Sequence, residues 1–282
     1  MKEYLKILVR GDIYFSMKKI FIVLFVVLFA FPLAAQNAEY YYMRGLIWVE
    51  KGDLTSAISD FSRAISLNPN NSDYLLDRGN AYLDNGNVDL AITDLSRVIA
   101  MSPMNEPAWY SRGSAYVASG EYDKAMDDFS RAISLNPDDP NVYSERGQLF
   151  YDKGDMDKAI TDFSKAISMD PQQESAFVSR GEAYLANGDA AKAIDDLTKA
   201  INLNPNSDSS WISRADAYLQ LNQADKAISD LNRAITLNPS NPASWNSLSN
   251  AYLAKGDYEQ AIKDLDKANE LDPNGKILNS NQ

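Results

Sequence analysis

The chain has 282 residues, carries a net charge of −12 at neutral pH and contains neither cysteine nor histidine. The absence of cysteine excludes disulfides, thiolate zinc sites and cysteine nucleophiles, and the absence of histidine excludes a Ser-His-Asp triad and an imidazole base. Because acidic surfaces repel phosphate groups, we expect no nucleic acid partner, and no membrane contact for the mature domain.

Residues 1–35 predict an export leader. The basic pair Lys18–Lys19 precedes an apolar run over residues 20–33, and Ala34–Ala35 follows it. This order is typical of a secretory signal, and the run is shorter than the roughly 20 apolar residues of a membrane span. We expect cleavage after Ala35 and a periplasmic or secreted protein, with an uncleaved membrane anchor as the alternative. A complete signal begins at Met17, which favours that residue as the true translation start.

From residue 38 the sequence repeats with a period of 34 residues. A closing proline keeps this step without a gap, at Pro69, Pro103, Pro137, Pro171, Pro205, Pro239 and Pro273. A fixed period in this range indicates a stacked array. The repeats span residues 38–71, 72–105, 106–139, 140–173, 174–207, 208–241 and 242–275, and a short tail at 276–282 follows.

Each repeat predicts two helices. Counted from the first residue of a repeat, position 4 is aromatic or Leu, position 8 is small, position 11 is aromatic, position 20 is Ala and position 24 is Phe or Leu. Positions 4, 8 and 11 fall on one helical stripe, and positions 20, 24 and 27 fall on a second. Gly or Asn between the stripes suits the left-handed end of a helix, and the closing proline prevents the second helix from continuing. Neighbouring repeats must stack, because one repeat alone cannot bury its aromatic face.

This pattern resembles the tetratricopeptide repeat, in register from residue 38 to about residue 275. The resemblance implies an all-α fold, a right-handed α-solenoid of seven helix-turn-helix units. The sequence departs from the family pattern at position 7, where the family usually has Leu. That position is Arg in the first six repeats and Leu248 in the last.

The recurring Arg predicts a structural ion pair. Position 7 lies beside the buried stripe, so a charge there needs a partner, and an Asp recurs at position 23 of every repeat. Because the two residues recur with the repeat, we interpret the pair as part of the scaffold rather than as an active site. The spacing leaves open whether each pair lies within one repeat or joins two.

A variable face of the first helices is the candidate binding site. Positions 2, 5, 9, 12 and 13 lie roughly opposite the buried stripe, and in tetratricopeptide arrays this face lines a concave groove that holds ligands. The candidate partner-binding residues are Glu39, Tyr42, Leu46, Asp73, Leu76, Asn80, Tyr110, Ser114, Gln148, Tyr151, Val178, Glu182, Ile212 and Asp216. The face lacks the Lys and Arg with which some family members hold a peptide carboxylate. Its apolar floor and acidic rim predict a protein or peptide partner with apolar and basic character.

No catalytic, cofactor or metal motif is present in the sequence. The glycines are spread at the repeat period rather than gathered in a phosphate-binding loop. The Asp- and Asn-rich turns lack the alternating carboxylates of a calcium loop and are typical turn formers. We therefore predict neither a cofactor nor an enzymatic activity.

Three functions follow from this reading, in decreasing order of support. The first is a non-catalytic interaction scaffold for cell-envelope assembly or secretion. The second is a self-assembling structural envelope protein. The third is an enzyme with paired carboxylates, which is the weakest because no non-repeating acid cluster stands out. The last repeat carries Leu248 in place of Arg and has no full capping helix after it, which predicts weak self-association or partner docking through this repeat.

Overall fold

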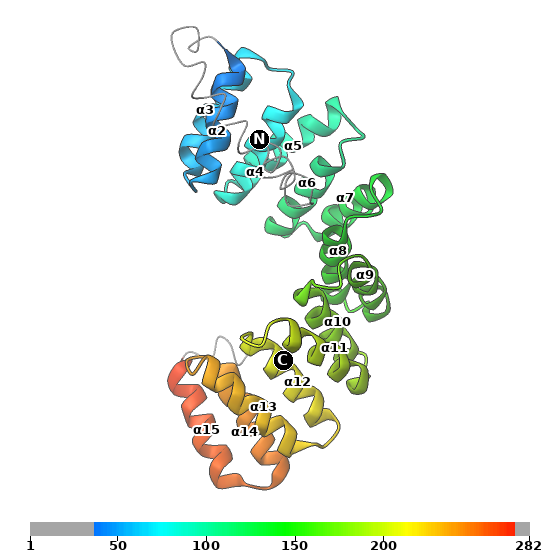
Figure 1. Cartoon of the computed structure of the whole chain (residues 1–282), viewed down its shortest axis with the longest axis vertical. Coiled ribbons are helices and arrows are strands. Elements are labelled where there is room, and N and C mark those ends of the chain that lie inside the picture. The colour runs from blue at the N-terminus through cyan, green and yellow to red at the C-terminus, as the bar shows by residue number, and fades with distance from the viewer. Residues whose placement is uncertain (1–36, 274–282) are drawn as a thin grey trace, which may run out of the picture. The chain divides into compact units, whose positions relative to one another are not determined.

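The computed structural model describes residues 37–273, which contain fourteen helices and no strand (Figure 1). The first helices of the repeats are α2 (Ala38–Glu50), α4 (Ser72–Asp84), α6 (Glu106–Ala118), α8 (Pro140–Asp152), α10 (Glu174–Ala186), α12 (Asp208–Gln220) and α14 (Pro242–Lys255). The second helices are α3 (Leu54–Leu67), α5 (Val88–Met101), α7 (Tyr122–Leu135), α9 (Met156–Met169), α11 (Ala190–Leu203), α13 (Ala224–Leu237) and α15 (Tyr258–Leu271). The all-α fold of seven helix-turn-helix repeats is confirmed. The leader at 1–35 and the tail at 276–282 lie outside the described residues.

The chain forms two compact units, Met1–Leu135 with helices α2 to α7 and Asn136–Gln282 with helices α8 to α15. Within each unit every helix packs against the next one along the chain. First helices also contact each other, α4 with α6 in the first unit and α8, α10, α12 and α14 in succession in the second. Each unit therefore presents a surface made of first helices only.

The turn between the two helices of a repeat has the backbone that the sequence predicts. Gly154, for example, has a φ of +80°, and the sixth repeat has Asn222 at this place with a φ of 58°. Asn tolerates this left-handed conformation better than most residues with a side chain. Side chains such as Asp155 then cap the second helix by accepting from a backbone N–H of its first turn.

The core of each repeat forms where the second helix meets the next first helix. In the second unit, Phe163 is 1% exposed and packs with Ala159 and with Ala183 of the following repeat. A Cβ atom added to Gly147 would lie 2.9 Å from the Phe163 ring, so the small residue at position 8 is required by close helix packing. The same arrangement recurs with Ala193, Leu197 and Ala217. Stacking of repeats therefore buries the aromatic stripe, as expected.

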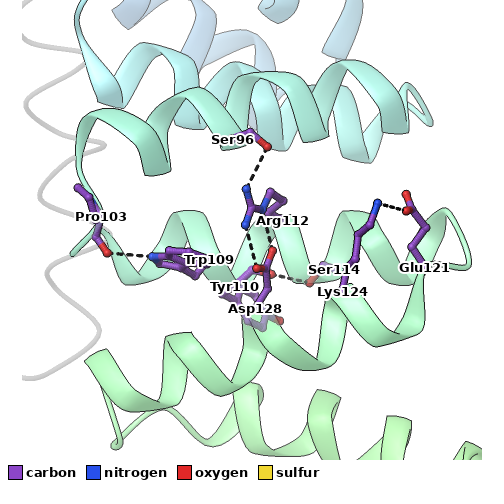
Figure 2. A network of polar contacts seen from close by, with 9 residues as sticks. All are labelled: Ser96, Pro103, Trp109, Tyr110, Arg112, Ser114, Glu121, Lys124 and Asp128. Carbon is purple, nitrogen blue, oxygen red and sulfur yellow. Dashed lines mark hydrogen bonds and ion pairs between the residues drawn. The ribbon is translucent and has the colours of Figure 1, made fainter.

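The recurring Arg and Asp form the predicted structural pair (Figure 2). Arg112 on α6 donates from Nε to Asp128 Oδ2 at 2.7 Å and from Nη2 to Asp128 Oδ1 at 2.9 Å, both within one repeat. Its Nη1 donates to Ser96 Oγ on α5 of the preceding repeat at 3.1 Å. Arg112 thus closes its own repeat with a bidentate pair, which answers the question the spacing left open, and it also contacts the repeat before it. Arg78, Arg180 and Arg214 have the same three contacts.

The last repeat lacks the recurring Arg–Asp pair. Leu248 stands at the Arg position and is buried, yet Asp264 is still only 4% exposed. Gln260 donates to Asp264 Oδ1 at 3.0 Å, while Oδ2 is buried without a hydrogen-bond partner among residues 37–273. Burial raises the pKa of the Asp264 carboxyl, because removing a carboxylate from water disfavours its charged form.

Candidate partner-binding face

The variable positions of the first helices lie on the surface that these helices share within each unit, which we call the first-helix face. The eight candidate residues from Glu39 to Ser114 lie on it in the first unit, and the six from Gln148 to Asp216 lie on it in the second. Because the helices contact one another side by side, side chains from consecutive repeats interact directly on this face.

Two candidate residues of the first unit form hydrogen bonds to other side chains of the protein. The Tyr42 hydroxyl donates to Asp77 Oδ2 at 2.7 Å, and Glu39 Oε2 accepts from the Tyr74 hydroxyl at 3.0 Å. The Tyr42 and Tyr74 rings pack at 4.6 Å between centroids. Burial and Glu39 raise the pKa of Tyr74 to about 12, and burial with the nearby Asp77 also raises the pKa of Tyr42. This network ties α2 to α4, so Glu39 and Tyr42 have a structural role in addition to their predicted one.

The other candidates of the first unit are mainly packing residues. Leu46 and Leu76 are partly buried against the core clusters. Tyr110 packs on Phe129 at 5.9 Å between ring centroids, and Ser114 Oγ donates to a carbonyl of its own helix. Asp73 is exposed in the first turn of α4, and Asn80 is partly buried. The candidate residues on the first-helix face of the first unit are therefore mainly apolar, or polar groups already bonded within the protein.

The second unit holds two half-buried carboxylates on the adjacent first helices α10 and α12. Ser213 Oγ donates to Glu182 Oε1 at 2.9 Å, and Ser247 hydrogen-bonds Asp216. Burial raises the pKa of Glu182, and it raises the pKa of Asp216 to about 6 with a further contribution from the Glu182 charge. No Lys or Arg among the described residues pairs with either carboxylate.

Apolar and aromatic side chains surround these carboxylates. Tyr151 is partly buried, and its pKa is raised by burial and by the nearby charge of Glu182. Val178 and Ile212 are partly buried against the neighbouring core clusters. Gln148 is exposed and donates to Asp152 at 2.9 Å. The first-helix face of the second unit thus combines the apolar and acidic side chains that the sequence predicts for the binding site.

Position 6 of the first helix was missed by the sequence interpretation. It supplies Asp77, Ser213 and Ser247, the side chains that bond to candidates of the preceding repeat. A signal was available, because position 6 is polar in every repeat after the first. These contacts orient the variable side chains, so position 6 is a positioning element of the face.

Among residues 37–273 no group of three metal-ligating side chains occurs. Within that same range, no helix is both long and apolar enough to cross a membrane.

The comparisons with known proteins place this architecture in one family. A family model described as TPR repeat matches four overlapping windows, 45–86, 79–120, 113–154 and 147–188. Two models described as tetratricopeptide repeat match residues 184–229 and 212–276. The chain belongs to the tetratricopeptide repeat family. No curated protein matches the sequence.

Solved structures of other tetratricopeptide repeat proteins share the fold. One from Parabacteroides merdae is 22% identical with a TM-score of 0.67, over 87% of this chain and 97% of its own. The pilF protein of Pseudomonas aeruginosa is 18% identical with a TM-score of 0.62, over 75% of this chain and 97% of its own. YrrB, described as having an unusual peptide-binding site, is 17% identical with a TM-score of 0.58, over 65% of this chain and 95% of its own. At these identities the likeness establishes the fold alone.

Proposed function

We propose that this tetratricopeptide repeat protein is a non-catalytic scaffold that binds a protein or peptide with basic and apolar side chains on its first-helix face. The observation that carries the proposal is the pair Glu182 and Asp216, two partly buried carboxylates on the adjacent first helices α10 and α12, near enough for the Glu182 charge to raise the pKa of Asp216, with no basic partner among the described residues.

The pair is a costly arrangement that a basic ligand would relieve. Removing a carboxylate from water disfavours its charged form, and the two charges also repel each other. An Arg or Lys side chain placed between them would form charge-assisted hydrogen bonds with both and favour their charged forms. Tyr151, Val178 and Ile212 supply apolar surface beside the pair for a neighbouring apolar side chain. The peptide-binding site described for YrrB supports the same kind of ligand for this fold.

We further infer a role in cell-envelope assembly or secretion. The support is the leader at residues 1–35, whose basic pair, apolar run and small residues are typical of an export signal. Export, and with it a periplasmic or secreted location, is a proposal that rests on this segment.

The proposal is tested by capturing the partner in cells with a photo-crosslinking residue at Tyr151. We expect a specific crosslinked product, and we expect the double variant Glu182→Gln, Asp216→Asn to reduce it about tenfold, because two charged contacts are lost. Asp195→Asn is the matched control, since Asp195 is an exposed carboxylate on the second helix α11. Equal crosslinking by the double variant and the control would show that the carboxylate pair does not bind the partner.

A further inference from the structure

The two ends of the described array carry matching surfaces. We define the leading face as Tyr40, Arg44 and Ile47 on α2, and the trailing face as Ile262, Leu265 and Asp266 on α15. These are the positions through which inner repeats contact the repeat before and the repeat after them. We propose that a second copy of this chain docks head to tail, with its leading face on the trailing face of the first copy, so that the repeat register continues from one copy to the next.

The apolar part of the trailing face is left uncovered. At position 24 the residues of the inner repeats are buried, as with Phe163 and Leu197, but Leu265 is 40% exposed. Ile262 on the same helix is 60% exposed. In the inner joints a residue at position 10 of the next repeat, most often alanine, covers position 24, as Ala183 covers Phe163. No described residue does so for α15.

The leading face has the complementary residue. Position 10 of the first repeat is Ile47, whose equivalents Ala81, Ala115, Ala183 and Ala217 are fully or almost fully buried. Ile47 is only partly buried, because no repeat precedes it among the described residues. A second copy placed in register would bring Ile47 onto Leu265 and bury both.

A charged contact in the same register supports this occupant. In the inner repeats Nη1 of Arg78, Arg180 and Arg214 donates to the hydroxyl at position 25 of the preceding repeat. These contacts are all 3.0 Å long and use Ser62, Ser164 and Thr198 as acceptors.

Among residues 37–273 no such acceptor precedes Arg44. Its side chain is 40% exposed, against 14% to 20% for the Arg residues of the later repeats, and Nη1 reaches the Tyr40 hydroxyl of its own helix at 3.3 Å.

Position 25 of the last repeat is Asp266, which is exposed and forms no hydrogen bond or ion pair within residues 37–273. The hydroxyl of the inner joints is thus replaced by a carboxylate at the place that would meet Nη1 of Arg44. A hydrogen bond from a guanidinium to a carboxylate is stronger than a hydrogen bond from the same guanidinium to a neutral hydroxyl. The charge pattern therefore favours a second copy of this chain over an unrelated apolar partner.

Docking of this kind joins two different faces, so it leaves one free face of each kind at the ends of every assembly. Growth is then open and increases with protein concentration. The proposed joint does not include the candidate residues of the first-helix face. Head-to-tail docking is therefore independent of the proposed ligand site, and an experiment can contradict one proposal without contradicting the other.

The test is the average mass of the protein over a wide concentration range, measured by light scattering on the form that its cells produce. We expect the mass to rise with concentration for the wild type, and Asp266→Lys to weaken association about tenfold or more because like charges then meet. Asp195→Lys is the control, as it makes the same charge change at an exposed site on α11 and should associate like the wild type. Ile262→Glu should resemble Asp266→Lys.

A mixing experiment establishes the direction of docking. Ile47→Glu inactivates the leading face and Asp266→Lys the trailing face, so each variant alone should stay monomeric. A mixture of the two should form dimers and nothing larger, since only one pair of intact faces remains. Association of Ile47→Glu by itself would mean that trailing faces pair with each other, and it would overturn the proposal. A wild type that stays monomeric at every concentration would also overturn the proposal. This holds whether or not a shortened chain that ends at Pro273 associates. Association of that shortened chain alone would show that residues 274–282 occupy the trailing face.

Discussion

Asp196→Asn is expected to lower the free energy of unfolding by about 3 kcal/mol, because it removes one partner of a buried ion pair. Arg180 donates to both oxygens of Asp196 at 2.7 Å, and Asn offers one acceptor and no charge. The Arg180 guanidinium would then be held between helices without a counterion. Urea unfolding followed by circular dichroism measures the change.

The same substitution in the last repeat is expected to have the opposite sign. Leu248 stands in the repeat of Asp264 where the other repeats have Arg, and Oδ2 of Asp264 is buried with no hydrogen-bond partner in the part of the chain that the structure describes. Asp264→Asn keeps an acceptor for Gln260 and removes the charge, so we expect a gain of about 1 kcal/mol at neutral pH. Since the folded protein raises the pKa of Asp264, the charged form costs stability above that pKa, and the gain should fade as pH falls through it. Because a terminal repeat can open alone, hydrogen exchange of the α15 amides should be measured beside the unfolding curve. Destabilisation by Asp264→Asn would mean that this carboxylate has a partner that the described residues do not contain.

Phe163→Ala is expected to lower the free energy of unfolding by about 4 kcal/mol, the range observed when a large buried aromatic is removed from a core. Phe163 is 1% exposed and fills the space above Gly147 and against Ala183 of the next repeat. The substitution therefore opens a cavity that reaches from its own repeat to the joint with the next one. Unfolding by urea should show the loss together with a broader transition, because coupling between neighbouring repeats makes such arrays cooperative.

The chain itself supplies the control for this prediction. Leu occupies the equivalent position in other repeats, as Leu95 and Leu197, and is fully buried there. Phe163→Leu should therefore cost only about 1 kcal/mol, because Leu suits this site elsewhere in the array. Equal losses for Ala and Leu would contradict the view that volume at position 24 holds the joint together.

The repeat scaffold could be predicted from the sequence because the same physical requirements recur seven times. The Gly at position 8, the turn Gly and the closing proline each fix a local conformation, and the Arg and Asp recur at positions that flank the buried stripes. A recurring Arg–Asp pair was therefore expected, although the spacing did not decide that Arg112 would pair with Asp128 of its own repeat. The third contact of Arg112, to Ser96 of the preceding repeat, was not expected, because the angle between consecutive repeats decides which side chain comes within reach.

The binding face could be predicted only in outline. Its residues follow from helical periodicity, but their environment depends on neighbours 30 or more positions away in the sequence. The Tyr42 hydroxyl donates a hydrogen bond to Asp77, and Glu182 accepts one from Ser213. The pKa of Asp216 depends on burial by the packed first helices and on the charge of Glu182, and neither quantity is visible in a stripe of variable residues.

The most direct measurement of the central claim is the pKa of the Asp216 carboxyl by NMR, first in the free protein and then saturated with the partner captured through Tyr151. Burial and the Glu182 charge raise this pKa to about 6 in the free protein. A basic side chain placed beside the carboxylate favours its charged form, so the account predicts that binding lowers the pKa below its value in the free protein. An Asp216 pKa that stays near 6 or rises in the complex would contradict the account, because the partner would then bind without a positive charge at this pair.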